Sequence, residues 1–266
     1  MKKIGIIGAG NMGGSTALGL MKSESFTAED LIISDPNAET LKCFNGTGVE
    51  LTNDNNKVAS EAEIVMVFVK SWLVETVLKG IKCSLDYSRQ MLVIVAAGVK
   101  SEQISTWLQK DGQAESVKPT FFLAIPNIAI ETKCSMTFVS PFNARPEQTV
   151  MIKDLFDEMG ETIIVEERLL GAGTTLASCG LAYAMRYVRA AVEGGVEMGF
   201  YPKDALNIVL QTVKGAVELL QSTGENPETA IDKVTTPGGV TIKGLNAMEH
   251  AGFTSAVIKG LKAGLQ

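Results

Sequence analysis

Short apolar runs alternate with segments of helical periodicity over the first 165 residues of the chain. The run from Ile64 to Val69 is apolar at every position, which is typical of a strand buried on both faces of a parallel sheet. The other predicted strands span residues 4–7, 31–34, 49–51, 91–95, 121–125, 136–139 and 162–165. Helices are expected after Gly13 and over residues 38–44, 72–78, 101–108 and 146–159, with Ser101 as a helix cap. This alternation predicts βαβ units in a doubly wound sheet.

From about residue 166 onward the pattern indicates helices and no convincing strand. One long helix is expected over residues 169–198, and a second over residues 202–222. Shorter helices should begin at Asn226-Pro227, Thr236-Pro237 and Phe253-Thr254, because polar caps and early prolines favour helix starts. The expected fold is therefore α/β, with a doubly wound N-terminal domain over residues 1–165 and an all-α C-terminal domain over residues 166–266.

A glycine motif, Gly8-x-Gly10-x-x-Gly13, lies between the first predicted strand and the first predicted helix. In a Rossmann-type domain the first glycine makes a tight turn, the second lets a pyrophosphate approach the backbone, and the third lets helix and strand pack closely. The helix that follows presents free N–H groups to the phosphates. The motif predicts a dinucleotide site because both flanking elements are present. The alternative is a glycine-rich turn in an ordinary α/β protein.

Asp35 follows the second predicted strand, roughly 20 residues after Gly13, where a ribose-binding acid is expected. A carboxylate there accepts hydrogen bonds from both ribose hydroxyls and repels a 2′-phosphate. The next residues, Pro36 and Asn37, supply no arginine that would hold such a phosphate. Taken alone, Asp35 favours NAD over NADP. A helix-capping role for Asp35 is the alternative, and one residue can serve both purposes.

A second glycine pair, Gly238-Gly239, follows Thr236-Pro237 and precedes Thr241. Two glycines in the first turn of a helix lower its propensity by about 1 kcal/mol each. They also leave backbone N–H groups uncovered, so this helix start is suited to a small anion such as a carboxylate. A plain capped helix with a flexible start is the alternative.

Composition and charge exclude several other classes. The net charge is −6 with a sequence pI near 5.0, and no basic run suggests nucleic-acid binding. No stretch approaches the ~18 consecutive apolar residues of a membrane-spanning helix. The four cysteines are scattered and the chain has one histidine, so no metal site is expected. A reducing cytoplasm is the expected location.

Together these motifs resemble the pyrroline-5-carboxylate reductase family, and the likeness runs over almost the full chain. The matching segments are residues 4–13, Val69-Lys70, Ala96-Ala97-Gly98, residues 235–241, Met248-Glu249 and Gly252-Phe253. The segment 235–241 is the specific signature, whereas the glycine motif alone is not.

Three segments depart from the family pattern. Ser71 replaces the proline that usually follows Val69-Lys70, and only Asn127 is kept in the turn at 126–129. The serine- and glycine-rich segment before Tyr183 is also altered, over residues 177–183. Another small cyclic imine, a 3-hydroxy acid, and a non-catalytic NAD(P)-binding regulator therefore remain as alternatives. A 3-hydroxy-acid dehydrogenase would need a lysine acid, and residues 169–198 contain none.

The resemblance implies reduction of the cyclic imine 1-pyrroline-5-carboxylate to L-proline with NADPH or NADH. It implies substrate binding by Asn127, Thr236, Gly238, Gly239 and Thr241, with Thr241 as the catalytic residue that could bond the ring nitrogen. The expected cofactor contacts are Gly8, Gly10, Asn11, Met12, Gly13, Asp35, Asn56, Val69, Lys70, Ala96 and Ala97. A homodimer, or an oligomer of dimers, is expected because the helical half has apolar residues on more than one face.

Overall fold

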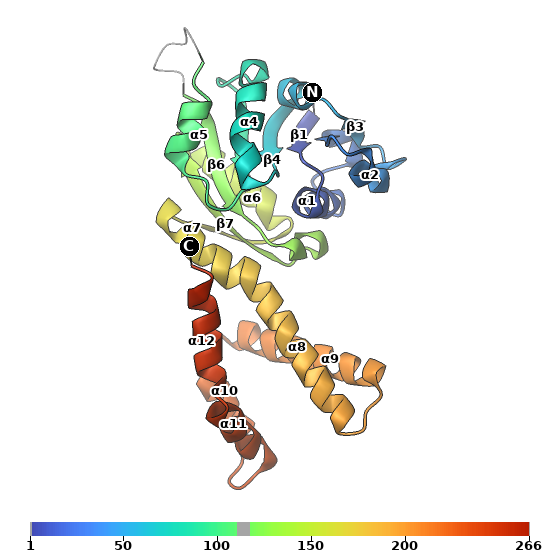
Figure 1. Ribbon diagram of the computed structural model, residues 1–266, viewed down its shortest axis with the longest axis vertical. Helices are drawn as coiled ribbons and strands as arrows, with labels where there is room; N and C mark the ends of the chain where they lie inside the picture. Colours follow the sequence, from blue (N-terminus) through green and yellow to red (C-terminus); the bar gives the residue numbers. More distant parts are fainter. Residues whose placement is uncertain (1, 111–117, 266) are drawn as a thin grey trace. The chain divides into compact units, whose positions relative to one another are not determined.

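The chain folds into two compact units in a computed structural model that describes residues 2–110 and 118–265 (Figure 1). The first unit runs through Ser178, and the second spans Cys179–Leu265. The sequence predicts a boundary near Val165. In the structure, residues 166–178 instead belong to the unit that contains the sheet. A doubly wound sheet followed by a helical part confirms the expected fold class.

Among the described residues, eight strands form one sheet in the order β3-β2-β1-β4-β5-β6-β7-β8. The strands are β1 (Lys2–Ile7), β2 (Leu31–Ser34), β3 (Glu50–Thr52), β4 (Ala62–Val67), β5 (Met91–Ile94), β6 (Thr120–Ile125), β7 (Ser135–Phe142) and β8 (Gly160–Ile164). Strands β6 and β7 pair antiparallel, and the other described pairs are parallel. The order reverses at β1 and β4, and ligands of doubly wound sheets bind outside such a switch point.

Helices cover both faces of this sheet and define two apolar cores. The helices of this unit are α1 (Asn11–Met21), α2 (Ala38–Leu41), α3 (Asn55–Glu61), α4 (Ser71–Ile81), α5 (Ser101–Trp107) and α6 (Pro146–Asp157). Short 3₁₀ segments are η1 (Ala28–Asp30), η2 (Lys42–Phe44), η3 (Lys82–Ser84) and η4 (Ile128–Thr132). Ile6 packs with α1 and α6 on one face, and Ile7 packs with α3, α4 and α5 on the other. This alternation follows from the two-residue period of a strand.

Helix α5 begins one residue earlier than a cap at Ser101 would require. Lys100 is the N-cap, and Ser101 is already the first helical residue. The capping acceptor comes from elsewhere: Glu167 accepts hydrogen bonds from the Ser101 N–H at 2.9 Å and from the Ser101 hydroxyl at 2.6 Å. Residues after β8 are thereby attached to the sheet unit.

The long helix expected over residues 169–198 is interrupted. It consists of η5 (Glu167–Leu169), α7 (Leu170–Gly173), a π-helical segment η6 (Thr174–Cys179) and α8 (Gly180–Glu197). Gly173 packs so closely on Phe138 that an added Cβ would lie 2.7 Å from the ring. The Ser178 hydroxyl donates to the Pro126 carbonyl at 3.0 Å. These contacts explain why the sheet unit extends to Ser178.

The second unit contains helices alone among its described residues. After α8 come α9 (Pro202–Thr223), α10 (Pro227–Lys233), α11 (Val240–His250) and α12 (Phe253–Ala263). Helices α8 and α9 approach closely where an added Cβ on Gly195 would lie 3.0 Å from the Ala205 Cβ. Large apolar side chains stay exposed, including Met198 (77%) and Tyr201 (79%). No helix in the described part of the chain has the length and apolar character needed to cross a membrane.

Candidate functional site

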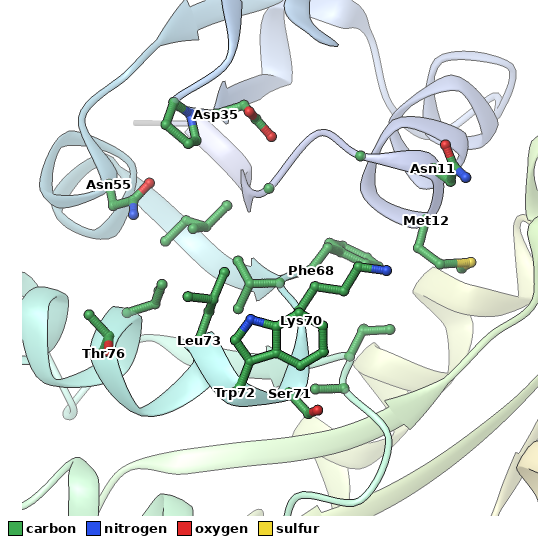
Figure 2. Close-up of a pocket in the computed structure, with 18 of the residues that line it drawn as sticks. Asn11, Met12, Asp35, Asn55, Phe68, Lys70, Ser71, Trp72, Leu73 and Thr76 are labelled. Atoms are coloured by element: carbon green, nitrogen blue, oxygen red, sulfur yellow. The ribbon is translucent and has the colours of Figure 1, made fainter.

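A cleft of about 740 Å³ opens at the carboxyl ends of β1, β2, β4 and β5 (Figure 2). Each segment that lines it follows a strand, because parallel strands deliver their carboxyl ends to one edge of the sheet. From the sequence-based set, the structure brings together Gly8, Gly10, Asn11, Met12, Asp35, Val69, Lys70, Ala96 and Ala97. The cleft is also lined by residues without a sequence signal, which include Pro36, Asn55, Phe68, Trp72, Leu73, Thr76 and Val77.

The three glycines of the motif have different surroundings. Gly8 has φ +97°, a conformation that other residues rarely adopt, and an added Cβ would lie 2.4 Å from the Phe68 carbonyl oxygen. An added Cβ on Gly13 would lie 1.9 Å from the Gly8 carbonyl oxygen, so this glycine permits helix α1 to approach the loop. Gly10 faces open space and is the N-cap of α1. The tight turn, the open approach and the close packing expected of the motif are all present.

Asp35 lies at the end of β2 and fixes the glycine loop in place. Its Oδ2 accepts a hydrogen bond from the Ala9 N–H at 2.8 Å, and its Oδ1 accepts one from the Asn37 N–H at 2.8 Å. A carboxylate oxygen has two acceptor sites, so both oxygens retain capacity for a ligand hydroxyl. Asp35 is not the helix cap that the sequence left open as an alternative. The N-cap of α2 is Asn37, whose side chain accepts a hydrogen bond from the Glu39 N–H.

Positive potential converges on the cleft from two helix starts and one lysine. Helices α1 and α4 both begin at the cleft, and the first turn of each leaves backbone N–H groups without a carbonyl partner in the helix. Neither first turn carries an acidic side chain. Lys70, the N-cap of α4, lines the cleft as well, and Figure 2 shows its side chain extended toward Met12 at the start of α1. This arrangement is suited to phosphate groups.

The structure does not bring Asn56 to the cleft. Its side-chain Oδ1 accepts a hydrogen bond from the hydroxyl of Ser84, at the end of η3, at 2.7 Å. The preceding residue, Asn55, lines the cleft instead, and its Oδ1 accepts from the Ser34 hydroxyl at 2.7 Å. Adjacent helical residues point about 100° apart, so a shift of one position exchanges the two side chains.

Asn127 is buried within the sheet unit, and its hydrogen bonds stabilise the local backbone. It is only 7% exposed, its N–H donates to the Ser135 hydroxyl at 3.1 Å, and its side-chain oxygen accepts from the Ala129 N–H at 3.0 Å. It thereby caps η4 in the connection between β6 and β7. Asn127 does not line the cleft described above.

The loop Thr236–Thr241 lies in the helical unit and differs from the expected helix start. Helix α11 begins at Val240, with Gly239 as its N-cap, so Gly238 and Gly239 precede the helix. Pro237 and Gly238 form a turn closed by the Gly239 N–H and the Thr236 carbonyl at 2.9 Å, and Gly238 has φ +71°. A positive φ after proline characterises a type II turn and is incompatible with helix.

Gly239 in this loop is required by a close contact. An added Cβ would lie 2.4 Å from the Thr236 hydroxyl oxygen. Thr241 is the second residue of α11 and is exposed. The first turn of α11 has backbone N–H groups without a carbonyl partner in the helix, and this kind of helix start is suited to a small anion. Anion binding by this loop and by Thr241 stays a prediction.

The cleft fits a dinucleotide. A Cβ at Gly8 would meet the backbone, the backbone at Gly10 is open, and Asp35 stands at the ribose position of such sheets. Small side chains at Ala96 and Ala97 leave room at the end of β5. Among residues 2–110 and 118–265, no three His, Cys, Asp or Glu side chains gather as a metal site.

Comparisons with known proteins agree with this geometry. A family model described as pyrroline-5-carboxylate reductase dimerisation matches residues 167–266, and one described as NADP oxidoreductase coenzyme F420-dependent matches residues 3–98. Pyrroline-5-carboxylate reductase 2 of Dictyostelium discoideum is 33% identical over 98% of this chain and 90% of its own length. Pyrroline-5-carboxylate reductase 1 of that organism is 35% identical over 97% of this chain, which spans 48% of that longer protein.

A solved structure shares the fold. The crystal structure of Plasmodium falciparum pyrroline carboxylate reductase with NADP bound aligns with a TM-score of 0.88 at 22% sequence identity, and the alignment covers 99% of this chain and 95% of the other. The full-length relationship, rather than the shared fold, decides the assignment, because unrelated functions occur on this fold. This chain belongs to the pyrroline-5-carboxylate reductase family.

Proposed function

We propose that this chain reduces 1-pyrroline-5-carboxylate to L-proline with NADPH or NADH. The observation that carries the proposal is the glycine cradle, which opens onto Asp35 and Lys70 in one cleft. The loop Thr236–Thr241 supports the choice of a carboxylate substrate, since its backbone is uncovered and two threonine hydroxyls flank it.

Within the cleft, the protein's contribution is binding and orientation. The backbone around Gly10 and the start of α1 would hold the pyrophosphate, and Lys70 would neutralise part of its charge. Asp35 would accept from ribose hydroxyls. When bound, the reduced nicotinamide supplies a hydride to the imine carbon.

The substrate requires two further interactions. Its carboxylate would accept N–H bonds from the first turn of α11, and the Thr241 hydroxyl would bond the ring nitrogen. A protonated imine is the better hydride acceptor, so a neutral hydroxyl partner suits a cationic nitrogen without opposing its charge. Positioning of the two reacting carbons provides the remaining rate acceleration.

Absorbance decay of NADPH and of NADH at saturating 1-pyrroline-5-carboxylate tests the proposal. Turnover that depends on the imine supports it. Turnover with a different cyclic imine and none with this one would instead assign the alternative substrate. Nucleotide binding without turnover on any imine would identify a non-catalytic regulator.

We further propose that the chain works as a homodimer in the cytoplasm. Large apolar side chains remain exposed on the helical unit, including Phe200, Tyr201 and Val240, and an uncovered set of this size marks a contact surface. Light scattering coupled to size exclusion should give at least twice the 28.3 kDa of one chain. A monomeric mass at micromolar concentration would contradict this part of the proposal.

A further inference from the structure

Trp72 lines the cleft but belongs neither to the glycine motif nor to the charged groups nor to the buried core. Trp72 is the second residue of α4, lines the cleft, and is 74% exposed. Figure 2 shows its indole between the side chains of Leu73 and Lys70, on the side of the cleft opposite Asp35. The chain's other tryptophan, Trp107, is half-buried at the end of α5 and packs against a core.

The exposed indole belongs to an apolar wall. Leu73, Thr76 and Val77 continue this wall along α4, and Leu73 is itself 44% exposed. Pro36 and Asn55 line the same cleft, and Pro36 directly follows Asp35. In doubly wound sheets the acid after the second strand binds the adenosine ribose, so this wall stands at the adenosine half of a bound dinucleotide.

An exposed tryptophan on a cleft wall is well suited to cover a flat apolar group of a ligand. Tryptophan buries a large apolar area when covered and stacks well on flat aromatic rings. Adenine is such a ring, and its stacking on an aromatic side chain does not depend on hydrogen-bond geometry. We propose that Trp72 stacks on the adenosine half of the cofactor and thereby positions it. The inference rests on the proposed function for the class of cofactor.

Calorimetry with ADP tests the contact without any reaction, because ADP carries the adenosine half and no nicotinamide. Trp72→Ala should raise the Kd for ADP by roughly 5- to 150-fold, the range expected for one lost stacking contact. Trp72→Phe keeps an aromatic face and should restore most of the affinity. Trp107→Phe is the matched control and should leave the Kd unchanged. An exposed position makes unfolding by these changes at Trp72 unexpected.

Fluorescence provides an independent readout. Addition of ADP should change the tryptophan emission of the unchanged protein and of Trp107→Phe, and should leave the emission of Trp72→Phe unchanged. If Trp72→Ala binds ADP within twofold of the unchanged protein, or if Trp107 carries the fluorescence response, the inference is wrong.

Failure of the proposed function is distinguishable from failure of this inference. A chain whose ADP affinity depends on Trp72, but which reduces no imine, retains the inference and loses the function. A chain that reduces the imine with ADP affinity independent of Trp72 does the reverse. Absence of binding for both ADP and NADPH overturns both.

Discussion

Asp35 holds the glycine loop in place, and we expect its charge to discriminate between the two cofactors. Its Oδ2 holds the Ala9 N–H at 2.8 Å, which fixes the glycine loop, while its charge faces the cleft. A substitution that removes the carboxylate altogether therefore disturbs the loop and the charge together. The two effects separate only when an acceptor oxygen is kept.

Asp35→Asn keeps one acceptor for Ala9 and removes the charge. We expect the unchanged protein to prefer NADH, because a carboxylate repels the 2′-phosphate of NADPH. Relief of about 1–2 kcal/mol of repulsion should shift the NADPH-to-NADH ratio of kcat/KM toward NADPH by roughly 5- to 30-fold. Asp35→Ser should shift the same ratio while weakening both cofactors. A tenfold preference of the unchanged protein for NADPH would contradict this account of Asp35.

Thr241 is the residue whose hydroxyl is proposed to bind the ring nitrogen of the substrate. Thr241→Val keeps the volume and deletes one hydrogen bond. Transition-state binding should weaken by about 1–3 kcal/mol, which lowers kcat/KM for the imine roughly 5- to 150-fold. The Kd for NADPH should barely change, because the cleft residues lie between Ile7 and Ala97. Thr212→Val is a suitable control, since Thr212 is exposed and its hydroxyl donates to the Ile208 carbonyl of its own helix, α9. Equal loss for cofactor and substrate would remove Thr241 from the substrate site.

At the scale of elements, the capping of α5 shows how a segment after the sheet is held. Glu167 receives two hydrogen bonds from Ser101, one from the backbone and one from the hydroxyl. Its neighbour Glu166 is exposed and pairs with Arg168 across 2.6 Å. Exposed pairs of this kind contribute about 0–1 kcal/mol.

Glu167→Ala should therefore lower the free energy of unfolding by about 1–3 kcal/mol, the usual range for a lost cap or a charged hydrogen bond. Glu166→Ala should lower it by less than about 1 kcal/mol. Urea denaturation followed by circular dichroism compares the two variants directly. Equal midpoints for both variants would mean that the Glu167 cap contributes little.

The sequence correctly predicts those elements whose local pattern fits a single type of secondary structure. Ile64–Val69 and the strand before Gly8 are apolar runs that fit a buried strand, and Gly8, Asp35 and Ala96 follow as strand-end residues. Two other features have no such signal. Proline favours both the first helical position and the second position of a turn, so Thr236-Pro237 alone cannot separate helix from turn. The register of Asn55 against Asn56 depends on where α3 begins, which few apolar positions define.

At the scale of the whole molecule, the two compact units divide after Ser178 rather than after Val165. Residues 166–178 contribute the Glu167 cap, the close contact of Gly173 with Phe138, and Leu170, which is 8% exposed. A separated sheet unit should keep this segment if it is to remain stable.

A fragment of residues 1–178 should thus be more stable than one of residues 1–165 by about 2–5 kcal/mol, the sum of a buried leucine and a cap. Both fragments should bind NADPH weakly, because they contain all the cleft residues from Ile7 to Ala97. Neither should reduce the imine, because Thr236–Thr241 is lost. Urea midpoints and calorimetry measure the two properties. Reductase activity in either fragment would contradict the assignment of substrate binding to the helical unit.

The antiparallel pairing of β6 with β7 also affects the order in which the sheet can assemble. Ile125 pairs with Phe138 across a short connection, whereas Ile7 pairs with Val67 only after a loop roughly fourfold to fivefold longer has closed. By loop-closure entropy the longer loop costs about 1 kcal/mol more. The β6–β7 ribbon should therefore form before the central parallel strands. Pulsed hydrogen exchange during refolding should show amides of β6 and β7 protected earlier than those of β1 and β4.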